Sequence, residues 1–206
     1  MARARAIAAA VLGAAILAQL GCALSPDPWS PKTYRAELRP YSTDTGALPP
    51  SWKRYQVKGM EDIAFFFAHD SGRAAITVSF TCGKYDDVPL EMLAEHLAIP
   101  MGRKARVLRA VCVRPAPRQV YRLVARGDYL YQEEAIYLDL GRVPDERADT
   151  VLDAYLVREP HCLVDLDLAA APDFYESARS DFENYLTSMG VPVDRGPAPG
   201  PEGESG

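Results

Sequence analysis

Alternating apolar and polar residues dominate the middle of the chain, in short runs separated by segments rich in Gly, Pro and Asp. The runs occupy residues 51–57, 63–69, 74–82, 105–113, 118–127, 129–141, 150–159 and 161–170. A period of two is typical of half-buried strands, and short connections between consecutive strands favour antiparallel pairing. The pattern predicts a weak first strand, a hairpin over 63–82 that turns at 70–73, and a meander of five strands over 105–170.

Two segments carry apolar residues at helical spacing instead. In residues 86–100, DDVPLEMLAEHLAIP, we expect a short helix with Asp87 as N-cap that stops near Pro100. In residues 172–190 a longer helix should end at Gly190. The predicted apolar stripe of this second helix is Phe174, Ala178, Phe182, Tyr185 and Met189. Together the segments predict a single α+β domain, with both helices on one face of a twisted antiparallel sheet of about six or seven strands.

This order of elements, a hairpin, a short helix, a meander and a final helix, resembles the PsbP-like fold of the PsbP photosystem subunits and the DcrB lipoproteins. The resemblance extends over residues 51–190 and rests on element order. It implies a binding or assembly factor rather than an enzyme. It carries over no functional residue, because no diagnostic motif accompanies it.

The N-terminal segment MARARAIAAAVLGAAILAQLG has arginines followed by an apolar stretch that is shorter than the ~20 residues needed to span a bilayer. This is the pattern of a secretory signal, residues 1–21. Gly21-Cys22 resembles the end of a bacterial lipobox, which implies cleavage before Cys22 and lipidation of its thiol. Ala23 in the next position resembles the signal for the outer membrane. Cleavage after Ala23, which would give a soluble periplasmic or secreted protein, is the alternative.

Composition divides the rest of the chain into three parts. Residues 22–50 are rich in Pro and predict a flexible tether, residues 51–190 form the α+β domain, and residues 191–206 predict a disordered Pro/Gly-rich tail. The chain has 23 basic residues, and two of them precede Cys22, so the mature chain would carry 21 basic and 28 acidic residues, a net charge of −7. This charge disfavours nucleic acid as a partner.

Charge is unevenly distributed within the domain. Residues 103–126 contain seven arginines and one lysine but no acidic residue, and alternation places Arg118, Arg122 and Arg126 on one face of a strand. These arginines form either a solvent-facing surface neutralised by cross-strand Arg–Asp pairs or a binding surface for an acidic partner or an anionic lipid headgroup. Asp165 and Asp167 likewise share one face of the last strand.

Residues that could carry chemistry lack the motifs of known sites. His69, His96 and His161 stand outside any metal or hydrolase motif, so we expect no catalytic residue, no metal and no cofactor. Cys82, Cys112 and Cys162 allow at most one disulfide within the chain, and the sequence does not fix which two would pair. Buried reduced thiols are the simpler interpretation.

These features predict a membrane-tethered lipoprotein of the bacterial envelope, on the periplasmic face of the outer membrane. We expect a non-enzymatic accessory, assembly or binding module whose contacts are the membrane, through Cys22, and an envelope protein. The alternative is a periplasmic carrier of a small apolar or lipid ligand, suggested by the aromatic residues Phe65, Phe66, Phe67, Tyr129 and Tyr131. The only support for the hypothesis of an enzyme is the abundance of Asp and Glu.

Overall fold

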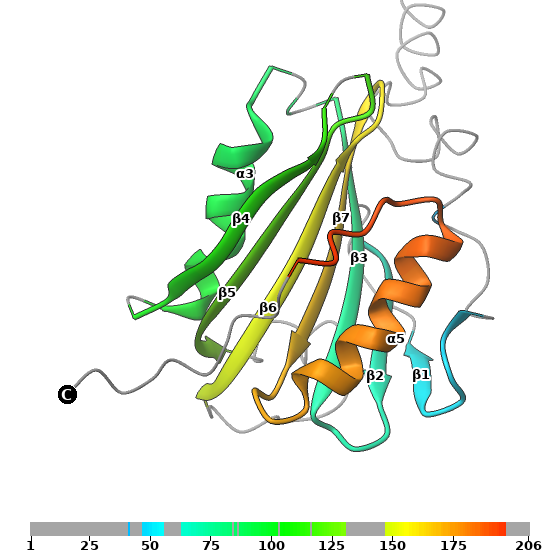
Figure 1. Cartoon of the computed structure of the whole chain (residues 1–206), viewed down its shortest axis with the longest axis vertical. Helices are drawn as coiled ribbons and strands as arrows, with labels where there is room; N and C mark the ends of the chain where they lie inside the picture. The colour runs from blue at the N-terminus through cyan, green and yellow to red at the C-terminus, as the bar shows by residue number, and fades with distance from the viewer. Residues whose placement is uncertain are drawn as a thin grey trace, which may run out of the picture.

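The computed structural model describes residues 41, 47–55, 63–83, 85, 87–102, 104–115, 117–130 and 147–196. These residues form one seven-stranded antiparallel sheet with two α-helices (Figure 1). The strands are β1 (Trp52–Tyr55), β2 (Ile63–His69), β3 (Ala74–Cys82), β4 (Arg106–Arg114), β5 (Val120–Leu130), β6 (Arg147–Arg158) and β7 (Cys162–Ala170). Their order across the sheet is β1-β2-β3-β7-β6-β5-β4, so β4 to β7 form a meander and β7 returns beside the hairpin of β2 and β3. The predicted fold class is confirmed.

The two helices, α3 (Leu90–Leu97) and α5 (Tyr175–Ser188), pack on opposite faces of the sheet. Alternate residues of β5 show this, because Val120 and Val124 belong to the core beneath α5, whereas Leu123 and Ala125 belong to the core beneath α3. The expectation that both helices cover one face is therefore wrong. Strands β5 and β6 have buried apolar residues on both faces, as is typical of strands covered on both sides.

Four of the five residues of the predicted stripe of α5 are buried: Ala178, Phe182, Tyr185 and Met189. The fifth, Phe174, is the N-cap residue and is only partly buried. Gly190 follows the helix with a φ of 72°. A positive φ is accessible to glycine without steric cost, so Gly190 lets the chain reverse after the helix. The side chain of Phe182 meets the Tyr155 ring of β6 edge-on, with 6.0 Å between ring centroids.

The beginning and end of α3 differ slightly from the prediction. Pro89, not Asp87, occupies the N-cap position, and no side chain caps the helix. The helix ends at Leu97. It is followed by the short 3-10 helix η2 (Ile99–Met101), which contains Pro100. Leu90 and Ala94 are buried against the sheet.

Gly127 and Asp128 do not separate two strands, although the sequence runs 118–127 and 129–141 meet there. Both lie inside β5, where Gly127 pairs with Thr150 of β6 and Asp128 pairs with Asp149. A Cβ atom at position 127 would lie 2.7 Å from the carbonyl oxygen of Met101. Glycine is therefore needed here because η2 packs closely on the strand, and not because the chain turns. The rest of the strand predicted over 129–141 lies, after Leu130, outside the described residues.

The domain extends beyond the predicted limits of 51–190 at both ends. Tyr41 is 0% exposed within the core, and Leu48 packs against it, so part of the predicted tether belongs to the domain. Val191 is also buried, and the segment 191–196 lies against the sheet rather than forming a free tail. The predicted signal peptide and Cys22 lie outside the described residues.

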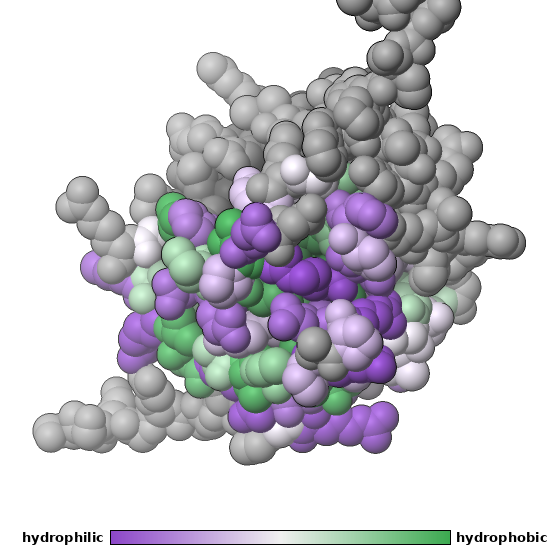
Figure 2. Space-filling model, turned by 90° about the horizontal axis from the view of Figure 1, so that it is seen from above, coloured by the Kyte–Doolittle hydropathy of each residue, from purple (hydrophilic) through white to green (hydrophobic). Residues whose placement is uncertain are grey.

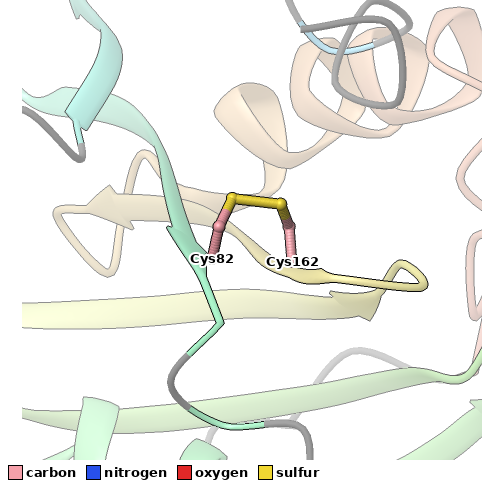
Figure 3. Close-up of a disulfide and its surroundings, with 2 residues drawn as sticks. All are labelled: Cys82 and Cys162. Atoms are coloured by element: carbon pink, nitrogen blue, oxygen red, sulfur yellow. A yellow bond between two sulfur atoms is a disulfide. The ribbon is translucent and has the colours of Figure 1, made fainter. Parts of the chain in front are cut away.

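One disulfide joins β3 to β7 (Figure 3). Cys82 and Cys162 are opposite one another in the strand register, with 4.0 Å between their Cα atoms, and both are buried. Cys112 is an exposed free thiol on β4. The interpretation of all three cysteines as buried reduced thiols is wrong, because the pairing of β3 with β7 brings two of them together.

Candidate functional site

Arg118, Arg122 and Arg126 each form an ion pair with an acidic residue. Two of the acidic residues lie on β6, and the third, Glu159, directly follows that strand. Arg118 contacts Glu159 at 2.8 Å, Arg122 contacts Asp153 at 2.7 Å, and Arg126 contacts Asp149 at 2.6 Å. This confirms the predicted cross-strand pairing. The hydrogen bond from Arg126 holds the pKa of Asp149 below its ordinary value.

Arg122 differs from the other two because it is only 1% exposed. Its guanidinium donates two hydrogen bonds to the Asp153 carboxylate, at 2.8 and 2.7 Å, and lies 5.3 Å from the centroid of the Tyr155 ring. The hydroxyl of Tyr175, on α5, donates to the same carboxylate at 2.7 Å. Burial alone would lower the pKa of Arg122, but hydrogen bonding and the charge of Asp153 raise it above its ordinary value. A solvent-facing position is therefore wrong for Arg122.

The C-terminal segment 191–196 forms hydrogen bonds with two arginines of this face. The Asp194 carboxylate accepts hydrogen bonds from Arg109 of β4 at 2.6 and 3.1 Å, and the Asp194 carbonyl accepts one from Arg122 at 2.6 Å. The hydrogen bonds from Arg109 lower the pKa of Asp194. These arginines bind a segment of their own chain, so the part of the predicted binding surface at Arg122 is already occupied.

Strand β4 is an open edge of the sheet, because no described strand pairs with its outer side. Its sequence RVLRAVCVR contains three arginines and no acidic residue, and Val107 is 53% exposed. Its register against β5 shifts between Val107 and Arg109 and again between Cys112 and Arg114, as at β-bulges. This is the most basic described strand, and its Arg106 lies opposite Arg126 of β5.

On the other face, a cavity of about 280 Å³ lies between α3 and the sheet. Leu93 and Leu97 of α3 form its apolar side, and Ser79 of β3 and Asp165 of β7 form part of its polar side. Oδ1 of Asp165 is buried and has no hydrogen-bond partner among the described residues. Burial raises the pKa of Asp165 to about 6, although a hydrogen bond with Asp167 and one with the backbone of Leu166 act in the opposite direction.

A second, more open cleft of about 500 Å³ lies between the start of α3 and strands β4 and β5. The free thiol Cys112, Tyr121 and Glu91 line it. Burial and the negative charges of Glu91 and Glu95 raise the pKa of Tyr121. Neither hollow could be predicted from the sequence, since each depends on where α3 packs.

The three histidines occupy different places. His69 packs between Trp52 and Phe174, and the exposed His161 lies between β6 and β7. The exposed His96 of α3 lines the same cavity as Asp165. Within the described ranges, no group of three His, Cys, Asp or Glu residues could hold a metal ion. Phe66 and Phe67 are buried, and Phe67 packs edge-on against Tyr185; the side chains of Phe65, Tyr129 and Tyr131 lie outside the description.

No helix in the described part of the chain is both long and apolar enough to cross a membrane. Figure 2 shows the molecule from above, where hydrophilic and hydrophobic side chains of the described residues are intermingled. Lipidation at Cys22 falls outside the described residues and stays a prediction.

Comparison with known proteins gives similarity to solved structures only; no protein-family model and no curated protein matches the chain. Cyanobacterial PsbP (CyanoP) from Synechocystis sp. PCC 6803 is 16% identical, with a TM-score of 0.46, over 71% of this chain and 88% of that one. Protein PA94 of unknown function from Pseudomonas aeruginosa is 9% identical, with a TM-score of 0.40, over 75% and 90%. The Ran-binding protein Mog1p of Saccharomyces cerevisiae is 11% identical, with a TM-score of 0.43, over 71% and 85%.

Proposed function

We propose that this chain is a non-enzymatic binding module of the bacterial envelope, tethered to the outer membrane through a lipid on Cys22. The module docks an acidic, extended segment of an envelope protein along β4. The observation that carries the docking proposal is the open, basic edge of the sheet at β4, on a chain whose overall charge is negative.

An edge strand offers backbone N–H and C=O groups to another extended segment, and its side chains select the partner. Arg109 is already paired with Asp194, so the exposed Arg114 is the arginine of β4 that favours an acidic segment. The excess of arginine on β4 also opposes pairing with the same strand of a second copy, because like charges would face each other. The two shifts of register leave a regular stretch between Arg109 and Cys112 for pairing. An anionic lipid headgroup would use the charge but not the backbone groups, so a protein segment fits this edge better.

The proposed lipid anchor and the proposed location in the envelope are supported by separate observations. Residues 1–21 have the pattern of a secretory signal, and Gly21-Cys22 resembles the end of a lipobox. The disulfide between Cys82 and Cys162 supports export, because disulfides persist in oxidising compartments such as the periplasm and are rare in the cytosol.

The docking proposal is tested by site-specific photo-crosslinking in cells of the bacterium that encodes the chain. A photoreactive residue replaces the exposed Ala110 of β4, and the charge of exposed Arg114 is reversed by Arg114→Glu. We expect one protein adduct whose yield falls in the Arg114→Glu background and falls with added salt in isolated envelopes. The variant should stay folded, since surface substitutions usually change stability by less than about 0.5 kcal/mol.

Arg54→Glu is the matched control, because it makes the same change of charge at an exposed residue of β1, the opposite edge of the sheet. It should leave the adduct intact. Adducts to lipid alone, or equal yields from the wild type and the Arg114→Glu variant, would contradict docking along β4.

A further inference from the structure

The cavity beneath α3 is lined by a carboxyl group with one oxygen that the described residues leave without a hydrogen-bond partner. Asp165 projects from the face of β7 that α3 covers, and its Oδ1 is buried without a hydrogen-bond partner in the described part of the chain. A buried acceptor left unsatisfied carries the full cost of its desolvation. Ser79 lies opposite Asp165 in the strand register and lines the same cavity, so polar groups converge on one side of it.

Asp167 makes this part of the cavity more negative. It lies two residues along β7 on the same face as Asp165, and the two carboxyl groups are hydrogen-bonded to each other. Two carboxyl groups in close contact repel anions and favour a ligand that brings positive charge and hydrogen-bond donors.

The opposite side of the cavity determines the kind of cation. Leu93 and Leu97 from α3, Leu156 from β6 and Leu163 from β7 supply its apolar lining, and His96 of α3 also lines the cavity. Calcium requires about six to eight oxygen ligands, and leucine side chains supply none. An organic cation instead places its charge on the carboxylate and its carbon chain against the leucines. The cavity volume of about 280 Å³ is just below the range of roughly 300–1,000 Å³ that holds drug-sized ligands, so the ligand is small.

We propose that this cavity binds a small primary amine, whose ammonium group donates hydrogen bonds to Asp165 and Ser79 while its short apolar chain packs against Leu93 and Leu97. The site is on the face opposite to the Arg122 network and is independent of docking along β4. Its ligand differs in class from an uncharged lipid or apolar ligand because the ammonium group is required.

The test uses n-pentylammonium as the probe, titrated into the isotopically labelled full chain at pH 7.5 and followed by two-dimensional ¹H–¹⁵N NMR. We expect saturable shifts in the amide signals of Ser79, Leu97 and Asp165, with an affinity at least about tenfold higher than that for uncharged 1-pentanol. Asp165→Asn keeps the size of the side chain and should weaken pentylammonium binding by about tenfold or more. Leu97→Trp, which fills the cavity, should abolish it.

Asp128→Asn is the matched control, because Asp128 is an exposed aspartate on β5 and its loss changes the net charge equally. It should leave the affinity within about twofold. Equal affinities for pentylammonium and 1-pentanol, equal losses in the Asp165 and Asp128 variants, calcium binding in place of the amine, or no saturable shift would each overturn the proposal. The NMR spectrum of each variant reports directly whether it is folded.

Discussion

Replacing Arg122 with methionine tests how the buried arginine contributes to the fold. Arg122→Met keeps an unbranched side chain but removes both hydrogen bonds to Asp153 and the one to the Asp194 carbonyl. Asp153, itself 1% exposed, then keeps a buried negative charge with the Tyr175 hydroxyl as its remaining side-chain donor. Removing one partner of a buried ion pair costs about 3–5 kcal/mol, because the other charge is left uncompensated.

Arg126→Met is the matched control. Arg126 lies on the same strand and makes a similar two-hydrogen-bond contact to Asp149, but the two side chains are 41% and 51% exposed. A pair at that exposure contributes less than about 1 kcal/mol, since water screens the charges. The two substitutions therefore remove similar contacts in different surroundings.

Equilibrium unfolding in urea at neutral pH, followed by circular dichroism, measures both free energies of unfolding. We expect Arg122→Met to lose about 3–5 kcal/mol, which corresponds to roughly 6–20 °C in Tm for a domain of this size. Adding Asp153→Leu to the same chain should recover much of the loss, because the uncompensated charge is then removed. Equal losses for Arg122→Met and Arg126→Met would refute the reasoning that burial determines the cost.

Two other predictions concern the disulfide and the buried aspartate. Replacing Cys82 and Cys162 with alanine should lower the free energy of unfolding by about 4.5 kcal/mol, because the bond closes a loop of 80 residues; Cys112→Ala should not, and denaturant unfolding that is unchanged by reductant would contradict this. Burial raises the pKa of Asp165 to about 6 in the folded protein, above the unfolded value near 3.9. The unfolded state therefore releases this proton first, and the folded protein loses stability as the pH rises from about 4 through 6. Asp165→Asn should therefore stabilise the protein by about 2 kcal/mol at pH 8 and very little at pH 4, and equal effects at the two pH values would rule out this origin.

The elements that depend on local pattern could be predicted from the sequence. The hairpin strands 63–69 and 74–82 and the stripe of α5 match the structure, because period and turn residues act over a few positions. Gly127 shows where this reasoning fails. A Gly-Asp pair has the composition of a turn, but the glycine is there for contact with Met101, which precedes it by many residues.

The surroundings of the candidate sites depend on distant segments that the sequence pattern does not align. Alternation correctly placed Arg122 on a face of β5, but its burial comes from α5 and the segment at Asp194. The pairing of Cys82 with Cys162 likewise depends on β3 lying beside β7. Alternation also placed Asp165 and Asp167 on one face, but the cavity there exists because α3 packs on the face opposite to α5.

Metabolic labelling with a palmitate analogue, combined with fractionation of the cells, tests the envelope-lipoprotein proposal most directly. The full chain should be labelled and sediment with the outer membrane, because several acyl chains hold a protein firmly whereas one holds it only marginally. Cys22→Ala should lose the label and leave the membrane fraction, whereas Cys112→Ala, which removes the exposed free thiol, should keep both. Label retained in the Cys22→Ala variant, or an unlabelled wild-type chain in the soluble fraction, would contradict the lipid anchor.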